Sequence, residues 1–323
     1  MHLLVTGAAG FIGSNFVRRL LTDQYNSTIE SVTVLDKLTY AGNLANLEPI
    51  SEDPRYRFVE GDIAEADDVK GCLDGIDVVV NFAAESHVDR SINGPAEFIR
   101  TNIAGAQTVF EACREQEIER IVHIGTDEVY GTISSGSWTE ESPLLPNSPY
   151  SAAKASAELL ARAYHRTYGM NISTTRCSNN YGPYQFPEKI IPLFVTNLID
   201  GKKVPVYGTG ENVRDWLHVD DHCDGIWTVL SKGEAGESYN IGGGTELNNL
   251  DLTRRILKLM NADDSSITWV EDRLGHDLRY SVDDTKVRKL GYTPKVDLEA
   301  GLEQTVQWYL DNESWWRPIL NQS

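Results

Sequence analysis

The sequence predicts an α/β protein with a doubly wound parallel sheet and a smaller, mixed α/β second domain. In the first half of the chain, short apolar runs alternate with segments whose apolar residues recur at helical spacing. Such alternation implies parallel strands joined by right-handed crossovers. A glycine-rich turn follows the first run directly, as is typical of sheets of this kind. Beyond about residue 180 the elements become shorter and glycine-rich turns separate them, which suits a smaller domain.

The expected elements of the first half can be bounded on the sequence. The strands are expected at Leu3–Thr6, Ser31–Leu35, Tyr56–Glu60, Val78–Asn81, Arg120–Ile124 and Ile172–Arg176. The helices are expected at Phe11–Leu21, Ala66–Leu73, Pro95–Arg114 and Tyr150–Tyr168, the last ending at Gly169. We assign residues 1–180 to the first domain and residues 181–323 to the second. Elements near residues 215–235 are expected to return and pack on the first sheet.

Composition and charge restrict the function. Of the 323 residues, 41% are hydrophobic and 24% are charged, which is ordinary for a globular enzyme with a sizeable core. The net charge of −19 argues against nucleic acid or an anionic membrane surface as a partner. The sequence shows neither a signal peptide nor an apolar run long enough to span a membrane, so we expect a cytoplasmic protein. The four cysteines lack metal-like spacing, which predicts reduced, buried thiols and no metal site.

A phosphate-binding turn is expected at residues 6–13, Thr-Gly-Ala-Ala-Gly-Phe-Ile-Gly. Its glycines permit a tight turn and let backbone N–H groups approach a pyrophosphate at the start of the first helix. Asp36 ends the second strand, where its carboxylate can accept hydrogen bonds from an adenine ribose and repel a 2′-phosphate. The first domain is therefore predicted to be a Rossmann-type domain that prefers NAD, although the neighbouring Lys37 leaves NADP open. The expected cofactor contacts are Gly7, Gly10, Phe11, Ile12, Gly13 and Asp36, with Asp62, Ile63, Phe82, Ala83 and Ala84 after the third and fourth strands.

A second pair of motifs indicates the chemistry. Tyr150 and Lys154 lie one turn apart on one face of the expected helix. An ammonium there, together with a positively charged nicotinamide, would lower the pKa of the tyrosine, and the phenolate could then take a hydroxyl proton while hydride leaves the same carbon. Earlier in the chain, Asp127 and Glu128 follow Thr126 after the fifth strand. The Tyr-Lys pair alone indicates oxidation of a hydroxyl, whereas the added carboxylates indicate an elimination in the same pocket.

These motifs give the chain a resemblance to the extended short-chain dehydrogenases/reductases, and most closely to the dTDP-glucose 4,6-dehydratase family. The resemblance covers nearly the whole length. It is carried by the segments Thr6–Gly13, Phe82–Asp89, Thr126–Gly131, Tyr150–Lys154, Ser178–Pro183, Asn212–Val219 and Gly275–Tyr280. The Thr-Asp-Glu triplet and the Gly-His-Asp segment are the marks most specific to the dehydratases. Gly125 departs from the serine expected just before the triplet, a change that should not abolish the chemistry.

The resemblance implies a dehydration that passes through a transient ketone. Tyr150, with Thr126 hydrogen-bonded to the same hydroxyl, would oxidise carbon 4 of a glucose. Glu128 would then remove the acidified proton from carbon 5, while Asp127 donates a proton to the hydroxyl that leaves carbon 6. NADH would return its hydride to carbon 6, so a tightly bound NAD would be regenerated in each turnover. Adjacent carboxylates in a partly desolvated site suit this division, because one of them stays protonated.

The second half of the chain would bind the nucleotide of a dTDP-sugar, again by resemblance. Arginines suit bidentate phosphate recognition, and they would give this acidic chain a local cluster of positive charge. The expected substrate contacts are Ser86, Thr126, Asn179, Lys189, Pro205, Tyr207, Arg214, Asn249, Arg273 and His276. Tyr150, Lys154 and Asn179 are also expected to contact the cofactor.

Three alternatives remain open on the sequence. A nucleotide-sugar 4-epimerase would share the cofactor fold and the Tyr-Lys pair, but it needs no carboxylate base and acid. A 4,6-dehydratase of a UDP- or GDP-linked hexose would differ in base selectivity, which depends on pocket shape. A catalytically silent nucleotide-sugar-binding module would have no need of all five catalytic residues.

Related enzymes pair the helices that correspond to Pro95–Arg114 and Tyr150–Tyr168, so the resemblance also implies a homodimer through a four-helix bundle.

Overall fold

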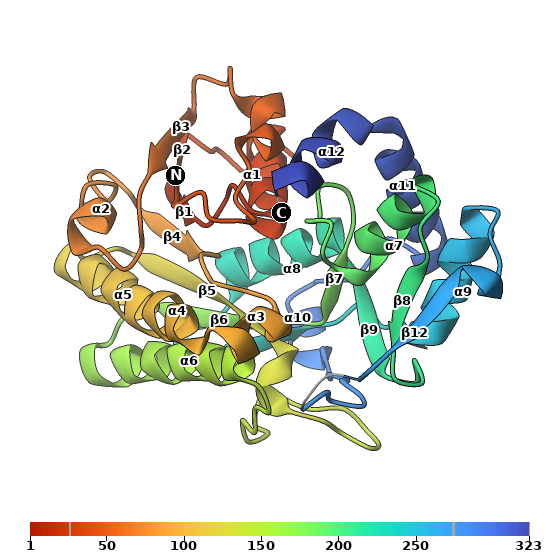
Figure 1. Ribbon diagram of the computed structural model, residues 1–323. Helices are drawn as coiled ribbons and strands as arrows, with labels where there is room; N and C mark the ends of the chain where they lie inside the picture. The colour runs from red at the N-terminus through yellow and green to blue at the C-terminus, as the bar shows by residue number, and fades with distance from the viewer. Residues whose placement is uncertain (26, 273–274, 323) are drawn as a thin grey trace.

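The structure, a computed structural model, describes residues 1–25, 27–272 and 275–322 (Figure 1). Within these residues, a seven-stranded parallel sheet with the order β10-β6-β5-β4-β1-β2-β3 forms the larger of two lobes. Its strands are β1 (His2–Thr6), β2 (Ser31–Asp36), β3 (Tyr56–Glu60), β4 (Val78–Asn81), β5 (Arg120–Thr126), β6 (Ile172–Cys177) and β10 (Ser238–Ile241). The strand order reverses between β1 and β4, where sheets of this kind bind ligands outside the carboxyl ends of their strands. The predicted doubly wound α/β class is confirmed.

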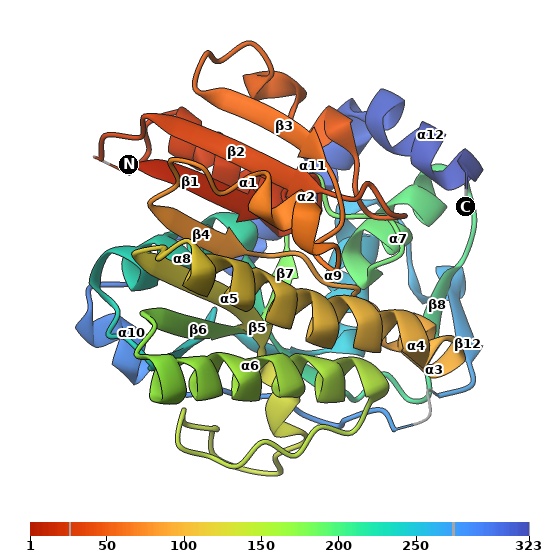
Figure 2. The same cartoon turned by 90° about the vertical axis from the view of Figure 1, so that its left-hand side faces the viewer.

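Helices cover both faces of this sheet, because its strands are buried on both sides. In β1, Leu3 and Val5 pack in the core beneath α1 (Phe11–Leu21) and α8 (Val219–Lys232), whereas Leu4 faces the opposite layer. That opposite layer, in which Figure 2 shows the two longer helices side by side, consists of α2 (Ala66–Lys70), α5 (Ala106–Glu115) and α6 (Pro149–Tyr168). Short helical segments connect the elements at η1 (Leu44–Asn46), η2 (Glu48–Ile50), α3 (Val88–Asn93), α4 (Pro95–Phe98), η4 (Asp127–Tyr130) and α10 (Thr285–Lys289).

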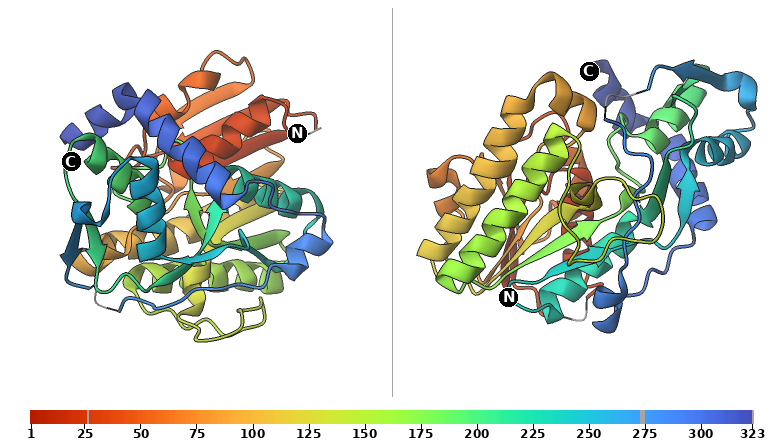
Figure 3. Two further views of the ribbon diagram at one scale, coloured as in Figure 1. Left: turned by 90° about the vertical axis from the view of Figure 1, so that its right-hand side faces the viewer. Right: turned by 90° about the horizontal axis from the view of Figure 1, so that it is seen from below.

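The smaller lobe has its own core, which the right-hand view of Figure 3 separates from the larger lobe. Its strands are β7 (Asn179–Tyr181), β8 (Val204–Tyr207), β9 (Val213–His218), β11 (Glu246–Asn248) and β12 (Ile267–Val270). Its helices are α7 (Ile190–Ile199), α9 (Asn249–Leu259), η5 (Asp264–Ser266), α11 (Leu298–Asp311) and α12 (Glu313–Gln322). No helix in the described part of the chain combines the length and the apolar character needed to cross a membrane. The four cysteines are buried free thiols, as predicted.

Elements from the second half of the chain return to the larger lobe. Helix α8 places Cys223, Ile226 and Val229 in the core beside α1, and β10 pairs with β6 as the edge strand of the large sheet. We keep the domain boundary at residue 180 as a proposal, with α8 and β10 belonging to the first domain.

The segment predicted as one helix at Pro95–Arg114 is interrupted. Helix α4 passes into a π-helical stretch, η3 (Ile99–Gly105), before α5 begins. In this stretch Asn102 exchanges two hydrogen bonds with the backbone of Glu85, donating to its carbonyl at 3.0 Å and accepting from its N–H at 2.8 Å. The π turn thus fixes the segment after β4 to the helix layer. The prediction of a continuous α-helix was wrong here, because apolar spacing does not distinguish one wider turn.

The boundaries of other elements shift by a few residues. Strands β5 and β6 continue to Thr126 and Cys177, because those residues still pair across the sheet. Helix α2 ends at Lys70 instead of Leu73, with Gly71 as its C-cap. Helix α6 starts at Pro149, just before the expected Tyr150, behind a Ser148 capping box. It ends at a left-handed Gly169, as predicted.

The last helix reaches back to the first turn of the chain. Trp315 Nε1 on α12 donates a hydrogen bond to Asn46 Oδ1 at 3.0 Å. Asn46 Nδ2 in turn donates to the carbonyl of Ala9, inside the glycine turn, at 2.8 Å. Figure 1 shows α12 beside the α1 end of the larger lobe. Residues at opposite ends of the chain therefore hold one turn in place.

Gly125 is required by a buried ion pair behind it. Arg176 Nε donates to Glu158 Oε2 at 2.7 Å, and both side chains are almost fully buried. A Cβ atom at Gly125 would lie 2.5 Å from Glu158 Oε1 and 2.5 Å from the carbonyl oxygen of Thr175. The absence of the serine expected before the catalytic triplet is therefore explained by packing, since the Glu158 carboxylate occupies that space.

Gly125→Ser is expected to lower the free energy of unfolding by about 1–3 kcal/mol, because the added side chain must displace Glu158 or the backbone of β6. Thermal or urea unfolding measures the loss. Gly94→Ser is the matched control, since a Cβ atom there meets nothing closer than 3.8 Å and the change should stay near about 0.5 kcal/mol. Equal stabilities of Gly125→Ser and the unaltered protein would contradict this account.

Candidate active site

Two adjoining cavities lie at the carboxyl ends of the large sheet. The first, of about 320 Å³, extends from the glycine turn to α6, and the second, of about 300 Å³, extends into the smaller lobe. They adjoin along shared lining residues, namely Ser86, Glu128, Tyr150, Asn179, Asn180, Gln185, Glu188 and Lys189. All five predicted catalytic residues line the first cavity, and Glu128 and Tyr150 line both. The structure thus brings the two sequence motifs together at the junction.

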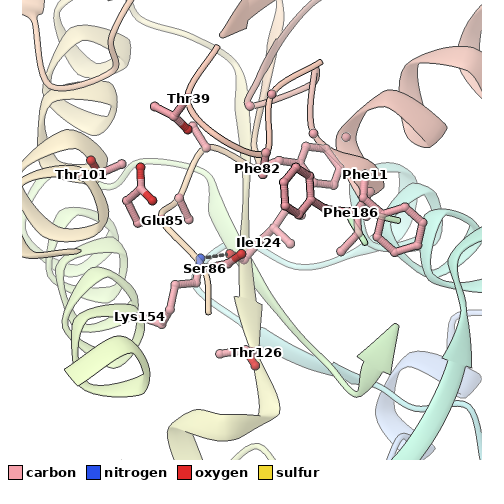
Figure 4. A pocket seen from close by; sticks show the side chains of 18 of the residues that line it. Phe11, Thr39, Phe82, Glu85, Ser86, Thr101, Ile124, Thr126, Lys154 and Phe186 are labelled. Atoms are coloured by element: carbon pink, nitrogen blue, oxygen red, sulfur yellow. Dashed lines mark hydrogen bonds between the residues drawn. The ribbon is translucent and has the colours of Figure 1, made fainter. Parts of the chain in front are cut away.

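Tyr150 and Lys154 reach this junction from the start of α6. Lys154 Nζ donates to the carbonyl oxygen of Ile124 on β5 at 2.6 Å, which fixes the ammonium beneath the cavity (Figure 4). Burial lowers the pKa of Lys154 to about 8, and the charge of Glu158 opposes that shift. The pKa of Tyr150 is raised well above 10, first by burial and then by Glu128, although a hydrogen bond with Thr126 lowers it. The sequence predicted a lowered pKa for Tyr150, and the protein groups alone do not produce it.

Asp127 and Glu128 occupy the short η4 helix that follows β5. Thr126 caps this helix, accepting a hydrogen bond from the N–H of Glu128 at 3.3 Å. Asp127 is 2% exposed, and burial followed by the charge of Glu128 raises its pKa well above the ordinary value of 3.8. Its Oδ2 atom has no hydrogen-bond partner among the described residues. A protonated Asp127 beside a second carboxylate is the arrangement that an acid-base pair requires.

The glycine turn fits the pyrophosphate of a dinucleotide. Among the residues that the structure describes, no side chain caps the N-terminus of α1, and the residues at this helix start line the first cavity. A Cβ atom at Gly7 would lie 2.5 Å from the backbone of Ala83, so only glycine lets β1 and the segment after β4 approach this closely. A Cβ atom at Gly13 would lie 2.8 Å from the Ala8 Cα atom. The turn therefore presents bare helix N–H groups to an anion.

The end of β2 fits an adenosine ribose. Asp36 lines the first cavity, and its two oxygens accept hydrogen bonds from the N–H groups of Ala9 and Leu38, each at 2.8 Å. Lys37 was the residue that left NADP open on the sequence. Its Nζ atom lies 2.8 Å from Asp62 Oδ2, so its charge is already engaged in an ion pair. The fourteen predicted cofactor contacts all line this cavity: Gly7, Gly10, Phe11, Ile12, Gly13, Asp36, Asp62, Ile63, Phe82, Ala83, Ala84, Tyr150, Lys154 and Asn179.

The second cavity collects most of the predicted substrate contacts. Ser86, Asn179, Lys189, Pro205, Tyr207, Arg214, Asn249 and His276 line it, while Thr126 lines the first cavity. Arg214 is 6% exposed, and its guanidinium donates to the carbonyl of Asp277 at 2.9 Å and lies 4.3 Å from the centre of the Tyr280 ring. Arg273, also predicted as a phosphate contact, lies outside the described residues.

The sequence reasoning missed several residues that line the first cavity: Thr39, Thr101, Asn180, Gln185, Phe186 and Glu188. Asn180 falls inside a segment that carried the resemblance, so its position offered a signal. Thr101 lies in the π-helical stretch, and no local motif marks it. The remaining residues come from loops that the chain folds over the cavity.

Comparisons with known proteins agree with this geometry. A family model described as GDP-mannose 4,6 dehydratase matches residues 4–305. A dTDP-glucose 4,6-dehydratase from Streptomyces niveus is 56% identical over 321 residues, which cover 99% of this chain and 96% of the relative.

Solved structures also place this chain nearer to the dehydratases than to an epimerase. The crystal structure of a dTDP-glucose 4,6-dehydratase from Streptomyces venezuelae, with NAD bound, is 58% identical, has a TM-score of 0.98, and aligns over 99% of this chain and 100% of its own. A UDP-glucose 4-epimerase from Thermotoga maritima is 30% identical, with a TM-score of 0.89 over 97% of this chain and 100% of its own. The identity to the dehydratases is thus much higher than to the epimerase. This chain belongs to the dTDP-glucose 4,6-dehydratase family of extended short-chain dehydrogenases/reductases.

Proposed function

We propose that this protein removes water from dTDP-glucose, giving dTDP-4-keto-6-deoxyglucose, with a tightly bound NAD that is regenerated in each turnover. The observation that carries the proposal is that Asp127 and Glu128 line the same cavity as Tyr150. An oxidation needs only Tyr150 and Lys154, whereas an elimination also needs a base and an acid. The dehydratases among the relatives support the choice of reaction and of nucleotide.

The first step is the removal of a proton from the hydroxyl on carbon 4. Tyr150 Oη takes this proton, and Thr126 stabilises the phenolate by hydrogen bonding to it. When bound, NAD supplies the hydride acceptor and later the hydride donor, together with a positive charge that opposes the raised pKa of Tyr150. The hydrogen bond to the Ile124 carbonyl holds the Lys154 ammonium in place, and this ammonium contributes positive charge beneath the cavity.

The second step is the elimination across carbons 5 and 6. A ketone at carbon 4 acidifies the proton on carbon 5, and the Glu128 carboxylate accepts that proton. Asp127 holds a proton because burial raises its pKa, and its Oδ2 atom has no hydrogen-bond partner among the described residues, which supports Asp127 as the acid that protonates the departing hydroxyl of carbon 6. General acid and base groups of this kind typically contribute about 10²- to 10⁴-fold each.

The same proposal includes location and assembly. We infer a cytoplasmic homodimer that pairs the helices at Pro95–Glu115 and Pro149–Tyr168 in a four-helix bundle. These helices lie side by side on one face of the molecule (Figure 2). Ile99, Leu159 and Tyr168 on them are each more than half exposed, and a dimer interface would cover such large apolar side chains.

Purified protein is expected to convert dTDP-glucose without added cofactor, because NAD remains bound. The product is detected by the absorbance of the 4-keto-6-deoxy sugar after addition of alkali, with UDP-glucose and GDP-glucose tested in parallel. A preference for dTDP-glucose supports the full proposal, and equal conversion of UDP-glucose would reject its base selectivity. Absence of signal with all three sugars, despite bound NAD, would reject the dehydration. Formation of dTDP-galactose would identify an epimerase instead.

Glu128→Gln is expected to separate oxidation from elimination. The variant should still reduce its bound NAD when dTDP-glucose is added, because Tyr150, Lys154 and Thr126 are intact. Exchange of the carbon 5 hydrogen with deuterated solvent should fall by about 10²- to 10⁴-fold, since the base is lost. Absorbance at the NADH maximum and mass spectrometry of the sugar measure the two steps. Full exchange in this variant would remove Glu128 from the base role.

Asp127→Asn is expected to increase stability more at pH 8 than at pH 5.5. Burial and Glu128 raise the pKa of Asp127, so the folded protein holds a proton that the unfolded chain releases above about 4. The contribution of this carboxyl to stability is therefore complete below its ordinary pKa of 3.8 and is lost as the pH rises through the raised value. The asparagine does not titrate and avoids that loss.

The Tm difference between Asp127→Asn and the unaltered protein, measured across this pH range, tests the shift. The exposed Asp74→Asn removes the same charge without burial and serves as the control. A difference that stays constant with pH would show that the pKa of Asp127 is not raised.

A further inference from the structure

Three segments from separate strands meet at the wall of the first cavity. They are the loop after β2 (residues 37–43), the segment from β4 into α3 (residues 82–93) and the segment between β7 and α7 (residues 182–189). Each contributes lining residues: Thr39 and Ala41, Ser86, and Phe186 with Glu188. Figure 4 shows Thr39, Ser86 and Phe186 at this wall. What joins the three segments is a set of contacts centred on Tyr40 and Arg90.

Tyr40 connects the first segment to the other two. Its hydroxyl donates a hydrogen bond to the carbonyl oxygen of Ser86 at 2.6 Å. The edge of one ring meets the face of the other between Tyr40 and Phe186, with centroids 5.5 Å apart and planes at 89°. Burial raises the pKa of Tyr40, so the hydroxyl stays protonated as a donor. One side chain thus holds Ser86 and Phe186, which both line the cavity.

Arg90, on α3, is the second residue at the centre of these contacts. Its guanidinium carbon lies 3.6 Å from the centre of the Tyr40 ring, a short cation–π contact. Its Nε atom donates to Glu188 Oε2 at 3.2 Å, and Glu188 is 18% exposed, whereas Arg90 is 45% exposed. Arg90 is therefore a surface residue that ties the second segment to the third.

The third segment is also anchored on its far side. The Tyr184 ring lies 4.2 Å from the guanidinium of Arg18 on α1 and 5.5 Å from Trp315 on α12. With Tyr184 fixed there, the chain from residue 185 to residue 188 has little freedom unless Phe186 and Glu188 lose their own contacts. The contacts that hold residues 185–188 to the other two segments are therefore those of Phe186 and Glu188 with Tyr40 and Arg90.

We propose that Tyr40, Arg90, Phe186 and Glu188 form a clasp that closes the cavity wall over bound NAD and retains the cofactor between the two hydride transfers. The clasp residues are positioning residues, since Tyr40 and Arg90 act through the lining residues Ser86, Phe186 and Glu188. This inference rests on the proposed function, because a reaction that returns its hydride to the same sugar must keep one cofactor throughout. A catalyst that released its cofactor after the first transfer would leave a ketone and no hydride to complete the reaction.

The test measures exchange of the cofactor in the whole protein. Arg90→Ala removes both the cation–π contact and the ion pair, and as an exposed substitution it should fold normally. Tyr40→Phe keeps the ring but removes the hydrogen bond to Ser86. Arg254→Ala is the matched control, since Arg254 is an exposed arginine on α9 that forms an ion pair with Asp264, and neither residue lines either cavity. Each protein is purified, its NAD content is measured, and release is followed by chase with isotopically labelled NAD.

Arg90→Ala is expected to release NAD about 3- to 10-fold faster than the unaltered protein, with a smaller increase for Tyr40→Phe and none for Arg254→Ala. Conversion of dTDP-glucose by Arg90→Ala should decline over successive turnovers and recover when NAD is added. Unchanged exchange in both clasp variants would overturn the proposal. An increase in the KM for dTDP-glucose with unchanged exchange would also overturn it, since the contacts would then gate the sugar.

The outcome separates the clasp from the proposed function. If the unaltered protein converts dTDP-glucose but purifies without NAD, the clasp is overturned and the dehydration stands. If the protein retains NAD, loses it faster in the clasp variants and yet converts none of the sugars, the clasp is supported and the dehydration is not.

Discussion

The architecture of the active site depends on a buried polar row that joins the carboxyl ends of β1 and β4 to the middle of β5. Thr6 on β1 donates a hydrogen bond to the Asn81 side chain on β4, and the Asn81 amide lies 3.1 Å from His123 Nδ1 on β5. Burial, and then the charge of Lys154, lowers the pKa of His123 well below 6.5, so the ring is neutral and can accept this bond. The row fixes the three strands side by side. Beyond it, the chain makes its glycine turn and places the catalytic triplet.

Burial, rather than the net charge of −19, sets the protonation of the proposed catalytic groups. Desolvation is the largest cause of the raised pKa of Asp127 and of Tyr150 and of the lowered pKa of Lys154. Asp127 and Tyr150 are thus held in their neutral forms before a substrate arrives, whereas Lys154, with a pKa of about 8, keeps its positive charge at neutral pH. The protonation of Asp127 is therefore set by its immediate surroundings, first by burial and then by the charge of Glu128.

The sequence specified the parts of the site that are local in the chain. The turn at residues 6–13 and the Tyr150–Lys154 pair were predictable, because their function follows from spacing within one turn or one helix. Thr101 was not, because its place in the cavity follows from a π-helical stretch that periodicity cannot detect. Phe186 and Glu188 were not, because they meet Tyr40 and Arg90 from distant segments. The fold class followed from the alternation of elements, whereas the return of β10 to the sheet edge depends on tertiary packing.

The contact from Trp315 through Asn46 to Ala9 has a consequence for the order in which the protein matures during synthesis. The glycine turn precedes α12 in the chain and is therefore synthesised before it. The core of the larger sheet is likewise complete only after α8 and β10 have been synthesised. A nascent chain therefore exposes the turn long before it has its full support. The full set of contacts that support the glycine turn is therefore assembled only after α12 has been synthesised.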